Sequence, residues 1–137
     1  MSRCRLVVVP IHNGHDHWCV GVIDVQRRAT VIYDSAGAGP AGAHAILQQW
    51  AAARLAQRRP GATVERWQQR LPERNPQQSN GHDCGVFMLM HIYYLCTGLD
   101  AAEIEQGNML SFRALAAAPS SFPICLTRPP PRLLDCR

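Results

Sequence analysis

The 137-residue sequence predicts a single α+β domain. Three observations predict it. Apolar runs of the β type are concentrated in the first third of the chain, the apolar pattern then becomes helical, and the longest apolar segment follows a polar loop in the second half. With 47% hydrophobic and 18% charged residues, the chain has enough apolar side chains to build a packed core.

The first third of the chain is typical of β structure. Residues 6–11 form a short run rich in β-branched side chains, and a polar loop follows at residues 12–16. Residues 18–25 are almost continuously apolar, which predicts a strand that is buried on both faces. Residues 29–33 form a third run after a polar turn, so we expect residues 18–33 to fold as a hairpin.

Helical patterns follow the strands. A helix is predicted over residues 43–58, and its expected apolar face comprises Ile46, Leu47, Trp50, Ala51 and Leu55. A short strand is expected at residues 64–71. Residues 85–96 are nearly all apolar, which predicts a central helix that is packed on all sides and ends at Gly98.

The end of the chain is expected to form one more helix and then a tail. The helix is predicted from residue 109 to residue 118, with Asn108 as its N-cap. Residues 119–137 are rich in proline and are expected to be extended and loosely held. The folded domain is therefore assigned to residues 1–118.

The composition bears on partners and compartment. The net charge is +4, but the 14 basic residues are all arginine and are scattered, so no nucleic-acid-binding surface is predicted. No apolar stretch approaches the roughly 18–20 residues of a membrane span. The six cysteines are unevenly spaced and include no CxxC pair, which favours free thiols inside a cell. We expect a monomer.

The strongest local pattern lies where a polar, turn-forming loop at residues 76–83 runs into the apolar helix. Cys84 is at this junction. The unpaired N–H groups and the positive end of a helix stabilise a thiolate over a thiol, and the same N–H groups can receive an oxyanion. Gly85 leaves space beside the thiol for a substrate backbone. The alternative is that Cys84 is a small buried residue with a structural role.

A cysteine nucleophile needs a base, and the base needs an orienting partner. His17 precedes the second strand and Asp34 follows the third, so the hairpin would bring them together. Asp34 could then accept the Nδ1–H of the ring and leave Nε2 for the thiol proton. Gln78 could supply an oxyanion donor beside the helix start. Taken singly, His17 could be a surface residue, Asp34 a turn residue, and Gln78 a plain loop residue like Gln77.

A zinc site is a separate hypothesis because several potential ligands lie close together in the sequence. They are His12, His15, His17 and Cys19, with His82 as a further candidate. Their spacing fits no common zinc pattern. We therefore predict no metal and no cofactor.

The order of these motifs resembles the Ulp/SENP family, the ubiquitin-like-specific cysteine proteases. The motifs are His17-Trp18, Asp34-Ser35, Gln78 and Asp83-Cys84-Gly85, and the resemblance spans residues 6–117. It implies a papain-like or adenain-like core, in which a small mixed sheet packs on a central buried helix that starts at the catalytic cysteine. Family catalytic domains carry a substantial segment before the first strand found here, and this chain is expected to lack it.

The resemblance also implies residue roles. His17 would be the general base, Asp34 its orienting partner and Cys84 the nucleophile. Gln78 would complete the oxyanion hole with the backbone N–H of Cys84. Trp18, beside Gly85, would cover the narrow C-terminal Gly-Gly tail of the substrate, unless its indole is simply a core residue.

The implied function is a thiol protease or isopeptidase that cleaves after the C-terminal Gly-Gly of a ubiquitin-like protein, SUMO by default. Two alternatives stay open: a ubiquitin-like-binding relative with little or no activity, and an effector-type acyltransferase that uses the same His-Asp-Cys core. The implied location is the nucleus or cytoplasm, or a host cell if the protein is a secreted effector.

Overall fold

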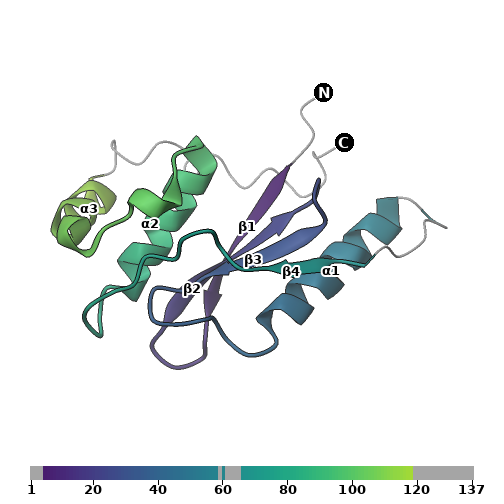
Figure 1. The fold of residues 1–137 in the computed structure, drawn as a ribbon, viewed down its shortest axis with the longest axis horizontal. Helices are drawn as coiled ribbons and strands as arrows, with labels where there is room; N and C mark the ends of the chain where they lie inside the picture. Colours follow the sequence, from purple (N-terminus) through teal and green to yellow (C-terminus); the bar gives the residue numbers. More distant parts are fainter. Residues whose placement is uncertain (1–4, 59, 61–65, 119–137) are drawn as a thin grey trace.

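The structure is a computed structural model that describes residues 5–58, 60 and 66–118, and it contains a four-stranded mixed sheet (Figure 1). The strands are β1 (Leu6–His12), β2 (Trp18–Asp24), β3 (Ala29–Tyr33) and β4 (Gln68–Arg70), in the order β1-β2-β3-β4. β1 and β3 run antiparallel to β2, whereas β4 runs parallel to β3. The predicted α+β class with a small mixed sheet is confirmed.

The hairpin of β2 and β3 is the part of the sheet that positions the site. In its register Asp24 is opposite Ala29, and Val20 is opposite Tyr33. The Asp24 side chain accepts a hydrogen bond from the Arg27 N–H at 2.9 Å and so closes the turn. Because antiparallel strands return the chain to the end where it started, the residue before β2 and the residue after β3 lie close together. The predicted hairpin is confirmed.

The strand predicted at residues 64–71 is shorter in the structure. Among the described residues of that range, 68–70 form β4, whereas residues 64 and 65 lie outside the described part of the chain. All three side chains of β4 are exposed, as is common at the edge of a sheet.

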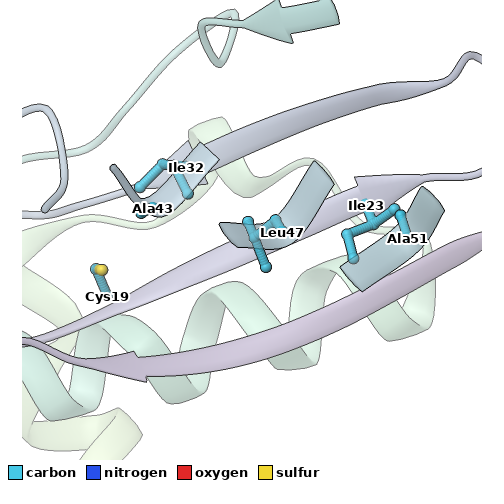
Figure 2. Close-up of a cluster of buried hydrophobic side chains, with 6 residues drawn as sticks. All are labelled: Cys19, Ile23, Ile32, Ala43, Leu47 and Ala51. Atoms are coloured by element: carbon cyan, nitrogen blue, oxygen red, sulfur yellow. The ribbon is translucent and has the colours of Figure 1, made fainter. Parts of the chain in front are cut away.

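Helix α1 (Ala43–Arg58) covers one face of the sheet (Figure 2). Its buried residues are Ala43, Leu47 and Ala51, and they pack against Cys19, Ile23 and Ile32. Gly21 allows this close approach, because a Cβ there would lie 2.7 Å from a methyl carbon of Leu47.

The apolar face predicted for α1 is partly wrong. The helix has the predicted bounds, but Ile46 is 67% exposed and Trp50 is 36% exposed. The row of small residues around Leu47 lets the helix sit close to β2, so the adjacent row that carries Ile46 and Trp50 turns outward. The indole of Trp50 instead lies 5.6 Å from the guanidinium carbon of Arg54.

Helix α2 (Cys84–Thr97) packs against the other face of β2. Cys19 and Ile23 face α1, and side chains alternate along a strand, so the buried Val20 and Val22 face α2. The strand is therefore buried on both faces, as predicted.

The helix begins at the candidate nucleophile and ends where predicted. Gly98 adopts φ of 77°, and the Leu99 N–H bonds to the carbonyl of Tyr94. The prediction that α2 is packed on all sides is wrong. Met88 and Leu89 are only half-buried, and Cys96 and Thr97 at the end of the helix are exposed.

The segment after α2 wraps back over it and completes a second core. Two short 3₁₀ helices, η1 (Ala101–Glu103) and η2 (Gln106–Asn108), precede α3 (Met109–Ala117). The α3 helix matches the prediction to within one residue, but the side chain of Asn108 makes no capping hydrogen bond. The 3₁₀ turns were not predicted, since three-residue helices have no detectable apolar period. The second core comprises Val86, Phe87, Met90, Ala101, Ile104 and Met109.

The structure tests two predictions about the whole chain only within its described residues. No helix among residues 5–58, 60 and 66–118 is both long and apolar enough to cross a membrane. Cys19, Cys84 and Cys96 are not in disulfide bonds. The tail at residues 119–137 lies outside the described residues, and the domain assignment stays a prediction.

Candidate active site

The hairpin brings His17 and Asp34 into direct contact. His17 precedes β2 and Asp34 follows β3, and the ring Nε2 lies 2.6 Å from Asp34 Oδ1. Both side chains are largely buried, so water screens this pair only weakly. The two residues are 17 positions apart in the sequence, and the hairpin of β2 and β3 brings them together.

The prediction that Asp34 contacts Nδ1 of His17 is wrong. Nε2, and not Nδ1, contacts Asp34, so Nδ1 is the nitrogen left to exchange a proton with a second group. A hairpin register determines which residues meet, but it does not determine which edge of an imidazole ring points at the acid. That edge is set by rotation of the side chain.

Amide side chains from the loop after β4 hold Asp34. Asn75 accepts a hydrogen bond from the Asp34 N–H at 3.2 Å and donates one to the Asp34 carbonyl at 2.9 Å. Gln77 donates to the same carbonyl at 2.9 Å. The expectation that Gln77 is a plain loop residue is wrong, and the role of Asn75 was missed. The concentration of amide side chains in this loop was the available sign.

Cys84 lies where α2 meets the start of β2. It is the first residue of α2, is 5% exposed, and its thiol donates to the carbonyl of Asp16 at 3.7 Å. Asp16 directly precedes His17, so the thiol and the imidazole come from segments in contact with each other.

The other described cysteines differ in surroundings. Burial, reinforced by the charge of Asp34, raises the pKa of the Cys19 thiol to about 11, so Cys19 stays a neutral thiol at physiological pH. Cys96 is exposed at the far end of α2. Among the three, Cys84 is the one whose thiol hydrogen-bonds to the residue before His17.

Gln78 is fixed in the loop opposite His17. Its N–H donates to the carbonyl of Ser35 at 2.7 Å, and its side-chain oxygen accepts from the Ser35 hydroxyl at 2.6 Å. One N–H of its amide donates to the carbonyl of Asn80. An open hollow of about 460 Å³ lies here, and residues 16–17, 35–36 and 77–81 line it.

Trp18 lies over the start of α2. A Cβ built on Gly85 would be 4.0 Å from an indole carbon of Trp18, and the His12 ring lies 4.6 Å from the indole. At 38% exposed, Trp18 is a surface residue and not a core residue. Its indole and Gly85 therefore form an apolar surface next to the thiol.

The residues of the zinc hypothesis do not converge. His17 is bonded to Asp34, Cys19 is in the core beneath α1, and His12 packs on Trp18. Within the described part of the chain, no three His, Cys, Asp or Glu side chains are grouped so that they could hold a metal ion.

Comparison with known proteins identifies the family of the chain. The profile of the Ulp1 protease family, C-terminal catalytic domain, matches residues 1–122. Ubiquitin-like-specific protease ESD4 of Arabidopsis thaliana is 32% identical over an aligned length of 117 residues, and the match covers 83% of this chain and 23% of ESD4. Ubiquitin-like-specific protease 1A of the same plant is 31% identical over an aligned length of 118 residues, and the match covers 85% of this chain and 23% of that relative.

Solved structures share the fold. The Ulp1-like SUMO protease catalytic domain of Chaetomium thermophilum is 27% identical, with a TM-score of 0.60, over 80% of this chain and 43% of that one. The yeast Ulp1 protease domain, solved in complex with Smt3, is 22% identical, with a TM-score of 0.60, over 80% of this chain and 48% of that one. This chain thus spans about a quarter of the two plant relatives and about half of these solved domains.

The fold and the comparisons define the class as that of cysteine proteases with a mixed α+β core. The chain belongs to the Ulp1 protease family and corresponds to part of its C-terminal catalytic domain. The resemblance seen in the sequence is confirmed.

Proposed function

We propose that this chain is the catalytic portion of a thiol protease or isopeptidase that cleaves after the C-terminal Gly-Gly of a ubiquitin-like protein of the SUMO type. One observation carries the proposal. The His17–Asp34 pair, with its 2.6 Å contact, lies next to a thiol whose hydrogen-bond acceptor is the residue before His17. This arrangement supports a triad in which His17 is the base, Asp34 its orienting acid and Cys84 the nucleophile.

The proposed reaction uses Nδ1 of His17. Nδ1 takes the proton of the Cys84 thiol, and the sulfur attacks the carbonyl carbon of the terminal glycine. The protonated ring, stabilised by Asp34 at Nε2, then gives its proton to the departing amine as the C–N bond breaks. Water, deprotonated by the same nitrogen, attacks the resulting thioester and releases the thiol and a carboxylate.

The negative charge that develops on the carbonyl oxygen needs donors. The first N–H groups of α2, beginning with that of Cys84, have no partner within the helix. The second proposed donor is Gln78. Its oxygen is held by Ser35 and one of its amide hydrogens by Asn80, so the other hydrogen remains for the oxyanion.

The specificity proposed here rests on Trp18 and Gly85. The indole lies over the start of α2 and close to Gly85, so a substrate tail that reaches Cys84 would run along the surface that the two residues form. Glycine residues, which have no β-carbon, fit such a surface best. The names of the plant relatives, which specify ubiquitin-like proteins, and the Smt3 bound to yeast Ulp1 support a substrate of this class.

The test is covalent capture by a SUMO whose C-terminus carries a vinyl sulfone. The parent protein and Cys96→Ala, which removes the exposed cysteine of the same helix, should form the adduct, whereas Cys84→Ala should not. Mass spectrometry locates the modified residue. Binding without an adduct would instead identify a non-catalytic binding module. Neither binding nor labelling, together with acyl transfer from an acyl-CoA, would identify a transferase.

A further inference from the structure

A buried carboxylate directly precedes the candidate nucleophile. Asp83 occupies the N-cap position of α2 and is 4% exposed, but its side chain does not cap the helix. It accepts hydrogen bonds from the side chains of Asn80 and Gln106, each at 2.7 Å. It also pairs with Arg113, whose Nε lies at 3.2 Å and whose second guanidinium nitrogen is closer still. All of these partners are side chains, and none is a helix N–H.

Two of these partners come from beyond α2. Gln106 lies in η2 and Arg113 in α3. Gln106 also accepts a hydrogen bond from the Ser79 N–H at 2.7 Å, and Arg113 donates to the carbonyl of His82 at 3.2 Å. The segment after α2 therefore forms hydrogen bonds with the backbone of the loop that ends at Cys84 as well as with the side chain of Asp83.

The charges in this cluster act on the position next to the thiol. Hydrogen bonds from Asn80 and Arg113 lower the pKa of Asp83 to about 2, so the carboxylate is ionised at neutral pH. A carboxylate beside a cysteine repels the negative charge of a thiolate, and a guanidinium paired with that carboxylate offsets this repulsion. The ion pair thus keeps the N-terminal end of α2 favourable to negative charge while holding the loop in place.

We propose that Arg113 and Gln106 are positioning residues for Cys84, which they hold in a thiolate-competent geometry through the side chain of Asp83. The inference rests on the proposed role of Cys84 as nucleophile. It assigns a function in the site to the C-terminal helical segment, which contributes none of the four candidate catalytic side chains.

Other titratable groups also surround the thiol, and a pH profile must be read against them. Those in the segments that meet at Cys84 are Asp16, His17, Asp34, His82, Asp83 and Arg113. The informative variants therefore change Arg113 alone and leave the His17–Asp34 pair untouched.

The experiment measures alkylation of Cys84 by iodoacetamide from pH 5 to pH 10, quantified on the Cys84 peptide by mass spectrometry. Arg113→Met removes the cation but keeps the length of the side chain, and Arg113→Lys keeps the cation. The matched control is Arg27→Met, which breaks an ion pair of similar kind, 3.1 Å long, at the opposite end of the hairpin. Thermal unfolding of each variant shows whether it is folded. If Arg113→Met does not fold, Arg113→Gln replaces it, because an amide can still donate to Asp83.

We expect Cys84 in Arg113→Met to be alkylated about tenfold more slowly than in the parent at neutral pH and at the parent rate at high pH. The reason is that an unpaired carboxylate next to a thiol raises the pKa of the thiol by about one unit or more. Arg113→Lys and Arg27→Met should follow the parent profile. An unchanged profile in a folded, neutral Arg113 variant would overturn the inference. Alkylation needs no protein substrate, so this result is separate from the outcome of vinyl sulfone capture.

Discussion

One side chain, that of Asn75, hydrogen-bonds both the N–H and the carbonyl of Asp34, at 3.2 and 2.9 Å. This pairing fixes the end of β3 to the loop that also carries Gln78. The acid of the candidate triad and the candidate oxyanion donor therefore belong to one hydrogen-bonded unit.

Replacing Asn75 should damage the site as well as the fold. In Asn75→Ala the N–H of Asp34 loses its partner in a partly buried setting, so we expect a loss of about 1–3 kcal/mol in the free energy of unfolding. Urea denaturation measures that loss, and turnover of a ubiquitin-like substrate should fall with it. Gln69→Ala, in the exposed edge strand, is the control. Parent-like stability and turnover in Asn75→Ala would show that the pairing is unimportant.

Asp34→Asn should have a moderate effect. Oδ1 of Asp34 accepts from both His17 Nε2 and the Ala36 N–H, so an asparagine would keep its oxygen at that position and preserve the tautomer of the ring. What is lost is the charge that stabilises the protonated imidazole, and we expect kcat to fall about 10- to 100-fold. Asp34→Ala, which also loses the orienting bond, should fall further. Equal losses in the two variants would contradict this division of roles.

Gln78→Ala should lower kcat by about 10²-fold with little change in KM, because it removes a donor that acts on the transition state. Steady-state kinetics with a fluorogenic ubiquitin-like substrate provides the measurement. The Ser35 hydroxyl loses its acceptor as well, so the thermal stability of the variant must be compared with that of the parent. A kcat within twofold of the parent would remove Gln78 from the oxyanion hole.

Gly85→Ala separates folding from substrate passage. A Cβ at this position would make an ordinary contact with Trp18, and alanine favours a helix over glycine by up to about 1 kcal/mol. We therefore expect the variant to be as stable as the parent or more stable, with unchanged alkylation of Cys84. The added methyl group should block a Gly-Gly substrate and reduce its kcat/KM about tenfold, which corresponds to a loss of about 1.4 kcal/mol in transition-state binding. Unimpaired kcat/KM would mean that the tail does not pass here.

The stability of the fold should fall in mild acid because of His91. Its ring is 1% exposed and packs on Tyr33, Nδ1 bonds to the Phe87 carbonyl, and Nε2 has no partner among the described residues. Burial lowers the pKa of His91 below the ordinary 6.5, so the unfolded state binds the proton more readily than the folded state. The free energy of unfolding should therefore decrease as the pH falls below about 6.5.

Urea denaturation between pH 7.5 and pH 5.5 tests this. The pKa of Asp83 is far below this window, so Asp83 adds no slope there. The lowered pKa of His44 adds a slope of the same sign, so His91→Met should flatten the dependence without abolishing it. His15→Gln, at an exposed position, should leave it unchanged. An identical slope in His91→Met and the parent would refute the assignment.

Local patterns in the sequence were enough to predict the three α-helices, the first three strands and where the candidate catalytic residues lie along them. The hairpin, the start of α2 at Cys84 and its end at Gly98 follow from short-range rules of strand pairing and helix termination. The adjacency of His17 and Asp34 could be predicted because a hairpin must bring its two ends together.

Details that depend on packing could not be predicted in this way. The outward position of Ile46 and Trp50 follows from how closely α1 approaches Gly21 in β2, and no local period of α1 contains that distance. The ring nitrogen that faces Asp34 depends on a side-chain rotation inside the assembled site.

The sequence alone determined the element order, the family resemblance and the set of candidate catalytic residues, since each follows from short motifs and their order along the chain. Only the tertiary structure decided which side chains support that set, namely Asn75 at Asp34 and Gln106 with Arg113 at Asp83. Those contacts join positions 23 to 41 residues apart, and hydrogen bonds over such separations arise only when separately folded elements pack into one arrangement.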